Sequence, residues 1–212
     1  MKTDDLIRLL ASDTLPVARG AASRRIAVSL LASLPVAVLI LLLYGLRPDL
    51  AEAARLPMFW VKLAFPAAVG IAAFAVMQRL ARPGVRPGAS WLALAVPVLL
   101  MGALAASSLA DAPAGERMSR VWGQTWRSCS VNIAVVSLPV FIAAFAAVRS
   151  LAPTRLAWAG ACAGAMAGGA GATVYALHCP ELEAPFLAVW YVLGILLPVV
   201  AGALLGPRLL RW

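Results

Sequence analysis

The feature that most constrains this chain is a series of long apolar blocks that leaves little polar surface. Hydrophobic residues make up 63% of the 212 residues and charged residues 13%, whereas a soluble domain of this size needs a polar surface. Several blocks approach the ~20 residues that a helix needs to cross a hydrocarbon core. The blocks are continuous rather than alternating, which favours helices over a closed barrel. We therefore expect an all-α polytopic bundle with six transmembrane helices, at about 27–46, 57–78, 91–110, 130–149, 156–177 and 185–206.

The basic residues are distributed unevenly between alternate loops. Most lysines and arginines fall in the segments that are inside if the N-terminus is inside, and the outer segments hold Arg47, Arg55, Arg117, Arg120 and Arg127. The positive-inside rule then places both termini in the cytoplasm. The positive-inside arrangement explains the net charge of +9. Membrane lipid rather than nucleic acid is therefore the expected partner. The expected division is a cytoplasmic tail at 1–26, a membrane domain at 27–206 and a cytoplasmic C-terminus at 207–212.

The N-terminal tail carries a pattern typical of a short amphipathic helix over about 3–12. Thr3 is a capping residue, and Asp4 and Asp5 place acids in the first turn, where the helix dipole favours them. Three leucines at helical spacing form an apolar face: Leu6, Leu9 and Leu10. Because about ten residues make a marginal helix in water, we expect this helix to gain order by docking on another surface.

The fifth expected span has glycines at every fourth residue: Gly160, Gly164 and Gly168. Small residues at this spacing let two helices approach closely. The favoured interpretation is tight packing within the bundle, and homodimerisation through this face is the second one.

Motifs of enzymes are scarce in the sequence. The single histidine excludes a His-rich catalytic or haem site, no glycine-rich phosphate loop is present, and the expected spans hold no paired carboxylates. We therefore expect no enzyme, no catalytic residue and no obligatory cofactor.

Two cysteines are placed to meet at one membrane face. Cys129 precedes the fourth expected span and Cys179 follows the fifth, and because these spans run in opposite directions both thiols fall at the outer face. They could form a disulfide, or they could bind Cu(I) or a similar thiophilic ion with the adjacent His178. The third interpretation is simple packing, which we also expect for Cys162 in the middle of the fifth span.

Lys62 is the charge within an expected span. One interpretation is that its ammonium snorkels to the outer interface. The other places the ammonium beside the outer thiols, where it would favour a thiolate. Lys62 and Glu181 are thus the residues expected to tune the outer site.

Several motifs combine rare residues at membrane positions. They are Met1-Lys-Thr-Asp-Asp-Leu-Ile7, Phe59-Trp-Val-Lys-Leu63, Thr125-Trp-Arg-Ser-Cys129, His178-Cys-Pro-Glu181, Pro185-Phe186, Trp190-Tyr191 and Gly206-Pro-Arg-Leu-Leu-Arg-Trp212. With these motifs the chain resembles, over nearly its full length, the NrsF family of anti-sigma factors in the bacterial inner membrane. Ser130 stands where that family more often has proline, and Cys162 has no place in its motifs.

The resemblance implies a regulator that holds an extracytoplasmic-function sigma factor and releases it under stress. The sensing pair would be Cys129 and Cys179 with His178 beside it, and the stimulus a heavy metal ion or an oxidant. The helix at Asp4–Leu10 would dock in a groove of the sigma factor with its leucines as anchors, and its acids would meet basic residues there. A membrane-surface helix is the alternative for this segment.

A different class of function is a thiol oxidoreductase or a soft-metal transporter of the inner membrane. Membrane thiol oxidases use two coupled cysteine pairs, whereas this chain has one outer pair. A transporter would need soft ligands deep in the bundle, where the sequence offers Cys162, Met101 and Met166.

Overall fold

The computed structural model describes residues 3–12, 20–80 and 88–211. These residues form helices and loops, with no β-strand among them. The elements in chain order are α1 (Thr3–Ser12), α2 (Ala21–Tyr44), α3 (Leu50–Ala53), α4 (Pro57–Leu80), α5 (Ser90–Asp111), α6 (Arg117–Trp122), α7 (Trp126–Arg149), α8 (Leu156–Tyr175), α9 (Ala184–Phe186), the π-helical turn η1 (Leu187–Tyr191) and α10 (Val192–Leu209). The all-α prediction is confirmed.

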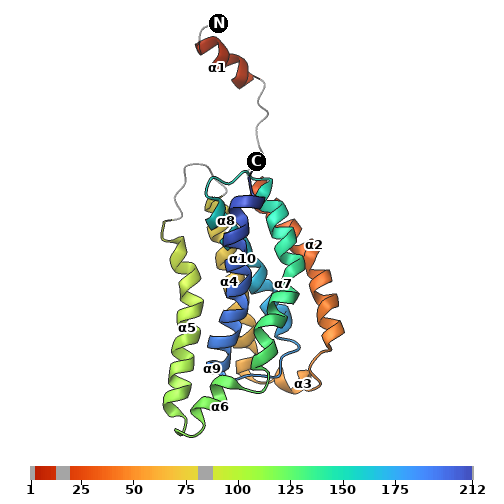
Figure 1. Ribbon diagram of the computed structural model, residues 1–212, viewed down its shortest axis with the longest axis vertical. Coiled ribbons are helices and arrows are strands. Elements are labelled where there is room, and N and C mark those ends of the chain that lie inside the picture. The colour runs from red at the N-terminus through yellow and green to blue at the C-terminus, as the bar shows by residue number, and fades with distance from the viewer. Residues whose placement is uncertain (1–2, 13–19, 81–87, 212) are drawn as a thin grey trace.

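The long helices lie side by side as one bundle (Figure 1). Five segments are long and apolar enough to cross a membrane: 21–44, 57–80, 92–111, 117–149 and 184–209. The fifth expected span, at 156–177, coincides with α8, which is 20 residues long, is rich in glycine and alanine, and is not among these five segments. Helix α8 packs against α4, α7 and α10. Five of the six expected spans thus coincide with segments long and apolar enough to cross a membrane, whereas the span at α8 and the six-span topology stay predictions.

The helices extend beyond the boundaries expected from the apolar blocks. Helix α2 begins at Ala21 rather than at 27, and α7 begins at Trp126 rather than at 130. Hydropathy marks only the part of a helix that suits hydrocarbon, whereas the backbone hydrogen bonds continue into polar flanking residues. Cys129 therefore lies inside the first turn of α7, not ahead of it.

The glycines of α8 are in backbone contact with α10. A Cβ atom added at Gly160 would collide with the carbonyl oxygen of Gly202, and one at Gly164 with that of Pro198. At Gly168 it would lie 3.0 Å from the carbonyl oxygen of Ile195. The packing interpretation of this glycine face is confirmed, and the face is therefore not free for a second copy of the chain.

Helix α1 lies apart from the bundle (Figure 1). It coincides with the helix expected over 3–12. All of its residues are exposed, with Leu9 and Leu10 exposed by 65% and 62%. Residues 1–2 and 13–19 of the expected tail, and the closing Trp212, lie outside the described residues. The apolar face of α1 has no cover within the described chain.

Candidate functional site

The thiols of Cys129 and Cys179 meet at the end of the bundle that carries α3, α6 and α9. Cys129 lies in the first turn of α7, and Cys179 lies in the loop that follows α8. Both side chains are fully buried and both thiols are free. The two sulfur atoms are within hydrogen-bonding reach of each other. Because α7 and α8 are antiparallel, the start of one and the end of the other share one end of the bundle, as the sequence predicted.

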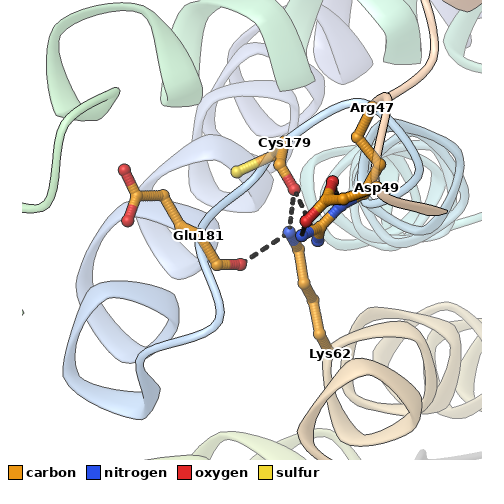
Figure 2. A network of polar contacts seen from close by, with 5 residues as sticks. All are labelled: Arg47, Asp49, Lys62, Cys179 and Glu181. Atoms are coloured by element: carbon orange, nitrogen blue, oxygen red, sulfur yellow. Dashed lines mark hydrogen bonds and ion pairs between the residues drawn. The ribbon is translucent and has the colours of Figure 1, made fainter. Parts of the chain in front are cut away.

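The loop that carries Cys179 is held by a buried lysine from α4. Lys62 is 0% exposed, and its Nζ donates hydrogen bonds to the carbonyl oxygens of Cys179, at 2.5 Å, and Glu181, at 2.7 Å (Figure 2). The ammonium also lies 5.6 Å from the ring centroid of Tyr191, within the range of a cation–π contact. The snorkelling interpretation of Lys62 is therefore wrong, because carbonyl oxygens inside the bundle solvate the ammonium instead of water.

A second cation, Arg47, holds the same loop from the α2–α3 side. Its backbone N–H donates to the carbonyl oxygen of Leu177 at 3.2 Å, and its Nη1 donates to that of Cys179 at 3.5 Å. Its Nε and Nη2 donate to the carboxylate of Asp49 at 2.8 and 2.7 Å. These hydrogen bonds from the guanidinium hold the pKa of Asp49 below its usual value. Sequence reasoning placed Arg47 in an outer loop but did not place it at the site.

The Glu181 carboxylate caps the start of helix α7. Its Oε1 accepts hydrogen bonds from the backbone N–H groups of Gln124, at 2.6 Å, and Thr125, at 3.1 Å. The hydroxyl of Thr125 donates to the same oxygen at 3.3 Å. Thr125 is the N-cap position of α7, so this carboxylate satisfies donors at the helix start that have no intrahelical partner. The tight approach needs Gly123, with φ +56, because a Cβ there would lie 2.8 Å from the Glu181 carboxylate.

His178 points to the α2–α3 loop. Its Nδ1 lies 2.6 Å from the carbonyl oxygen of Gly45, which can only accept, so Nδ1 carries a proton. The ring lies between Tyr44 and Tyr175, with centroid distances of 5.7 and 5.4 Å. Within the described residues no group of three His, Cys, Asp or Glu side chains is placed to hold a metal ion. The structure therefore brings Cys129 and Cys179 together, whereas it engages His178 elsewhere.

Two hydroxyl groups complete the surroundings of the Cys179 sulfur. The Oγ1 of Thr125 lies 4.0 Å from it. Tyr191, at the end of η1, is 0% exposed, and its hydroxyl lies beside the same sulfur with no hydrogen-bond partner among the described residues. Tyr191 belongs to the motif Trp190-Tyr191, but the sequence predicted no role for it, because the π-helical turn at Leu187–Tyr191 sets the direction of its side chain.

The site places two thiols, of Cys129 and Cys179, near the positive charge of Lys62. The hydrogen bond with Cys129 lowers the pKa of the Cys179 thiol. The positive charge of Lys62 lowers this pKa further, whereas burial opposes the shift. Cys162 is buried in a separate apolar cluster with Met77, Val148 and Met166 and takes no part in this site. Two adjacent thiols of this kind can bind a thiophilic metal ion or be oxidised to a disulfide.

Comparison with known proteins gives a family for the whole chain. Residues 10–212 match the family NrsF, described as negative regulator of sigma F. The probable anti-sigma-F factor NrsF of Azospira oryzae is 44% identical over 213 residues, which cover 100% of both chains. The anti-sigma-F factor NrsF of Caulobacter vibrioides is 41% identical over 219 residues, again covering 100% of both chains. No solved structure matches the chain.

The matched region contains every residue of the thiol site, and the full-length relatives also cover α1. Members of this family are regulators that bind a sigma factor, not enzymes. With a family match over residues 10–212 and two full-length relatives above 40% identity, the chain belongs to the NrsF family of anti-sigma factors.

Proposed function

We propose that this chain is an inner-membrane anti-sigma factor whose outer thiol pair controls its affinity for the sigma factor. In this proposal both termini are cytoplasmic and the end of the bundle with Cys129 and Cys179 faces the periplasm. The meeting of these two thiols in one buried site, in a member of a family of anti-sigma factors, is the observation that carries the proposal. The outer face of a bacterial inner membrane is oxidising, so thiol chemistry there can report the state of the environment.

On the cytoplasmic side the proposed contact is α1. Its leucines are exposed, and Asp4 and Asp5 lie in its first turn. An amphipathic helix with this pattern suits an apolar groove in a protein partner, and its acids suit basic residues at the rim. The partner is a sigma factor, and the family resemblance favours one of the extracytoplasmic-function type.

The proposed signal starts in the loop that carries Cys179. Residues of this loop contact three other elements: the α2–α3 loop through Arg47, α4 through Lys62, and the start of α7 through the Glu181 carboxylate. A metal ion or a disulfide that joins Cys129 to Cys179 would therefore act on α4 and α7 together, and both helices run to the opposite end of the bundle, roughly 30 Å away. Regulation requires that the ion binds the sigma-releasing state more tightly than the sigma-holding state.

A pull-down of the sigma factor by the full chain in lipid nanodiscs tests the cytoplasmic contact. A Leu9→Glu/Leu10→Glu variant should lose most of the captured sigma factor, because two anchors of the apolar face become charged. Arg8→Ala, on the opposite face of α1, is the matched control and should capture as much as the unaltered chain. Equal capture by the Leu9→Glu/Leu10→Glu variant would show that α1 is not the docking element.

A further inference from the structure

An apolar groove lies between α2 and α4, with α8 as its floor. Its volume is about 510 Å³. Helix α2 packs mainly against α7, whereas α4 packs against α5 and α8, so the two wall helices do not close on each other. All three helices contribute apolar side chains to the lining, among them Ala27, Leu34, Ala67, Phe74, Met166 and Val174.

The surface of the groove is apolar along its length. Among the described residues that line it, Thr173 alone has a polar side chain, and its hydroxyl already donates to the carbonyl oxygen of Gly169 at 2.7 Å. Water would gain few hydrogen bonds on such a surface, and an empty groove forfeits the dispersion contacts that a filled one makes. An extended apolar chain is therefore the occupant that this surface suits.

An arginine lies at the end of the groove where α2 begins. Arg24 is exposed, and it lies one helical turn before Ala27 of the lining, on the same side of α2. The neighbouring Arg25 is directed to the loop between α7 and α8, because its Nη1 donates to the hydroxyl of Ser150 at 3.0 Å. Arg24 thus places a positive charge beside the end of an apolar groove.

The other wall of the groove has an amide at the same end. Ile26 of α2 and Met77 of α4 belong to one buried cluster, so the start of α2 lies beside the end of α4. Gln78, which is half-buried, lies one helical turn after Phe74 of the lining, on the same side of α4. Guanidinium and amide N–H groups are both donors, and together they suit the negative oxygens of a phosphate.

We propose that this groove binds an anionic phospholipid, with an acyl chain between α2 and α4 and its phosphate at Arg24 and Gln78. The combination of an apolar groove and a positive end carries the inference, because a soluble anion would leave the groove empty and a neutral lipid would leave the arginine unused. Basic pockets between transmembrane helices bind anionic head groups in this way. The assignment of the head group to the inner leaflet rests on the proposed function, whereas the binding itself does not.

Native mass spectrometry of the full chain in detergent, titrated with palmitoyl-oleoyl phosphatidylglycerol, tests the inference. The unaltered chain should retain one molecule of this lipid more tightly than phosphatidylcholine with the same acyl chains. Arg24→Ala should bind phosphatidylglycerol about fivefold more weakly, which is the contribution of one basic residue near anionic lipid. Arg208→Ala, in the last turn of α10, is the matched loss of charge outside the groove and should bind like the unaltered chain.

A second pair of variants tests the groove itself. Ala67→Phe places a ring in the lining and should abolish the tight binding, whereas Ala75→Phe, on the exposed face of the same helix, should keep it. Equal affinity of Arg24→Ala and the unaltered chain, or equal retention of the two lipids, would overturn the inference. A dimer that phosphatidylglycerol leaves intact and Ala67→Phe dissociates would assign the groove to a second copy and would also overturn it. Because no variant touches Cys129 or Cys179, each of these failures leaves the proposed thiol site standing.

Discussion

The ammonium of Lys62 lies 2.5 Å from the carbonyl oxygen of Cys179, so a charge buried in α4 holds the backbone of this cysteine. The same ammonium reaches the carbonyl oxygen of Glu181 at 2.7 Å. Lys62 therefore holds the backbone of the loop around Cys179 through two hydrogen bonds. The carboxylate of Glu181, in the same loop, caps the start of α7. This relationship couples the position of the thiol to two long helices of the bundle.

Removal of the Lys62 charge should destabilise this end of the bundle. In Lys62→Met two buried carbonyl oxygens lose their donor, which costs about 1–3 kcal/mol of unfolding free energy. Thermal unfolding in detergent measures the loss. The control is Lys62→Arg, which keeps a charge but not the compact ammonium and should recover only part of the stability. Full stability in Lys62→Met would show that the two hydrogen bonds contribute nothing to the fold.

The Glu181 carboxylate should stabilise the first turn of α7, which carries Cys129. Glu181→Ala removes the acceptor of two backbone N–H groups and should cost about 1 kcal/mol, as the loss of a helix cap does. Hydrogen exchange of residues 124–129 should accelerate. Glu183→Ala is the matched control, because that carboxylate is 3.9 Å from Arg120 and its side chain is 49% exposed; it should leave the exchange unchanged. Equal effects of the two variants would contradict a specific cap.

The contact between α8 and α10 should tolerate no side chain at its glycines. Gly164→Val would drive a side chain into the backbone of α10 at Pro198, and such overpacking costs about 1–3 kcal/mol or more. Gly102→Val is the matched control in α5, because no heavy atom lies within 4 Å of a Cβ there. Yield of monodisperse protein and its thermal midpoint should fall only for Gly164→Val. A stable Gly164→Val variant would mean that the two helices are not in backbone contact.

The reactivity of Cys179 should persist at lower pH than that of an ordinary thiol, whose pKa is about 8.5. The hydrogen bond with Cys129 and the field of Lys62 lower the pKa of Cys179, so at neutral pH more of it is thiolate. The stability that this shift contributes is present above the pKa of the unfolded chain and is lost as the pH falls through the lowered value.

Alkylation of Cys179 by a small haloacetamide, followed by mass spectrometry of the peptide, measures this pH dependence. The rate profile should move to higher pH in Cys129→Ala, because the hydrogen bond that contributes most to the shift is absent. Cys162→Ala is the control and should not move it. A profile of the unaltered chain centred at or above the ordinary pKa of a thiol would contradict the assignment.

The sequence was sufficient for the architecture and for the meeting of the two thiols. Continuous apolar blocks predict helices, and the alternation of their directions brings the start of α7 and the end of α8 together, with Cys129 and Cys179 at the same end. The glycine spacing at Gly160 and Gly164 predicted close helix packing, because that contact depends on backbone size alone. Each of these features depends only on the sequence of one helix or on the order of the helices along the chain.

The partners of the buried side chains could not be predicted in this way. Lys62 binds carbonyl oxygens of a loop that is 117 and 119 residues further along the chain, and Arg47 binds the same loop. The path of this loop follows from its whole set of contacts, which hydropathy does not describe. Tyr191 enters the site because a π-helical turn changes the phase of the last long helix, and a regular α-helical projection cannot show that change. The path of the loop after α8 also explains why His178, although adjacent to Cys179 in sequence, is hydrogen-bonded to Gly45.

The most direct test of the central claim is the release of the sigma factor from the full chain in nanodiscs when Cu(I) is added to the outer face. Cu(I) should release the bound sigma factor from the unaltered chain, whereas Cys179→Ser should retain it under the same conditions. Cys162→Ser serves as the control and should release it like the unaltered chain. Retention of the sigma factor by the unaltered chain at saturating Cu(I), or equal release from Cys179→Ser, would contradict the account.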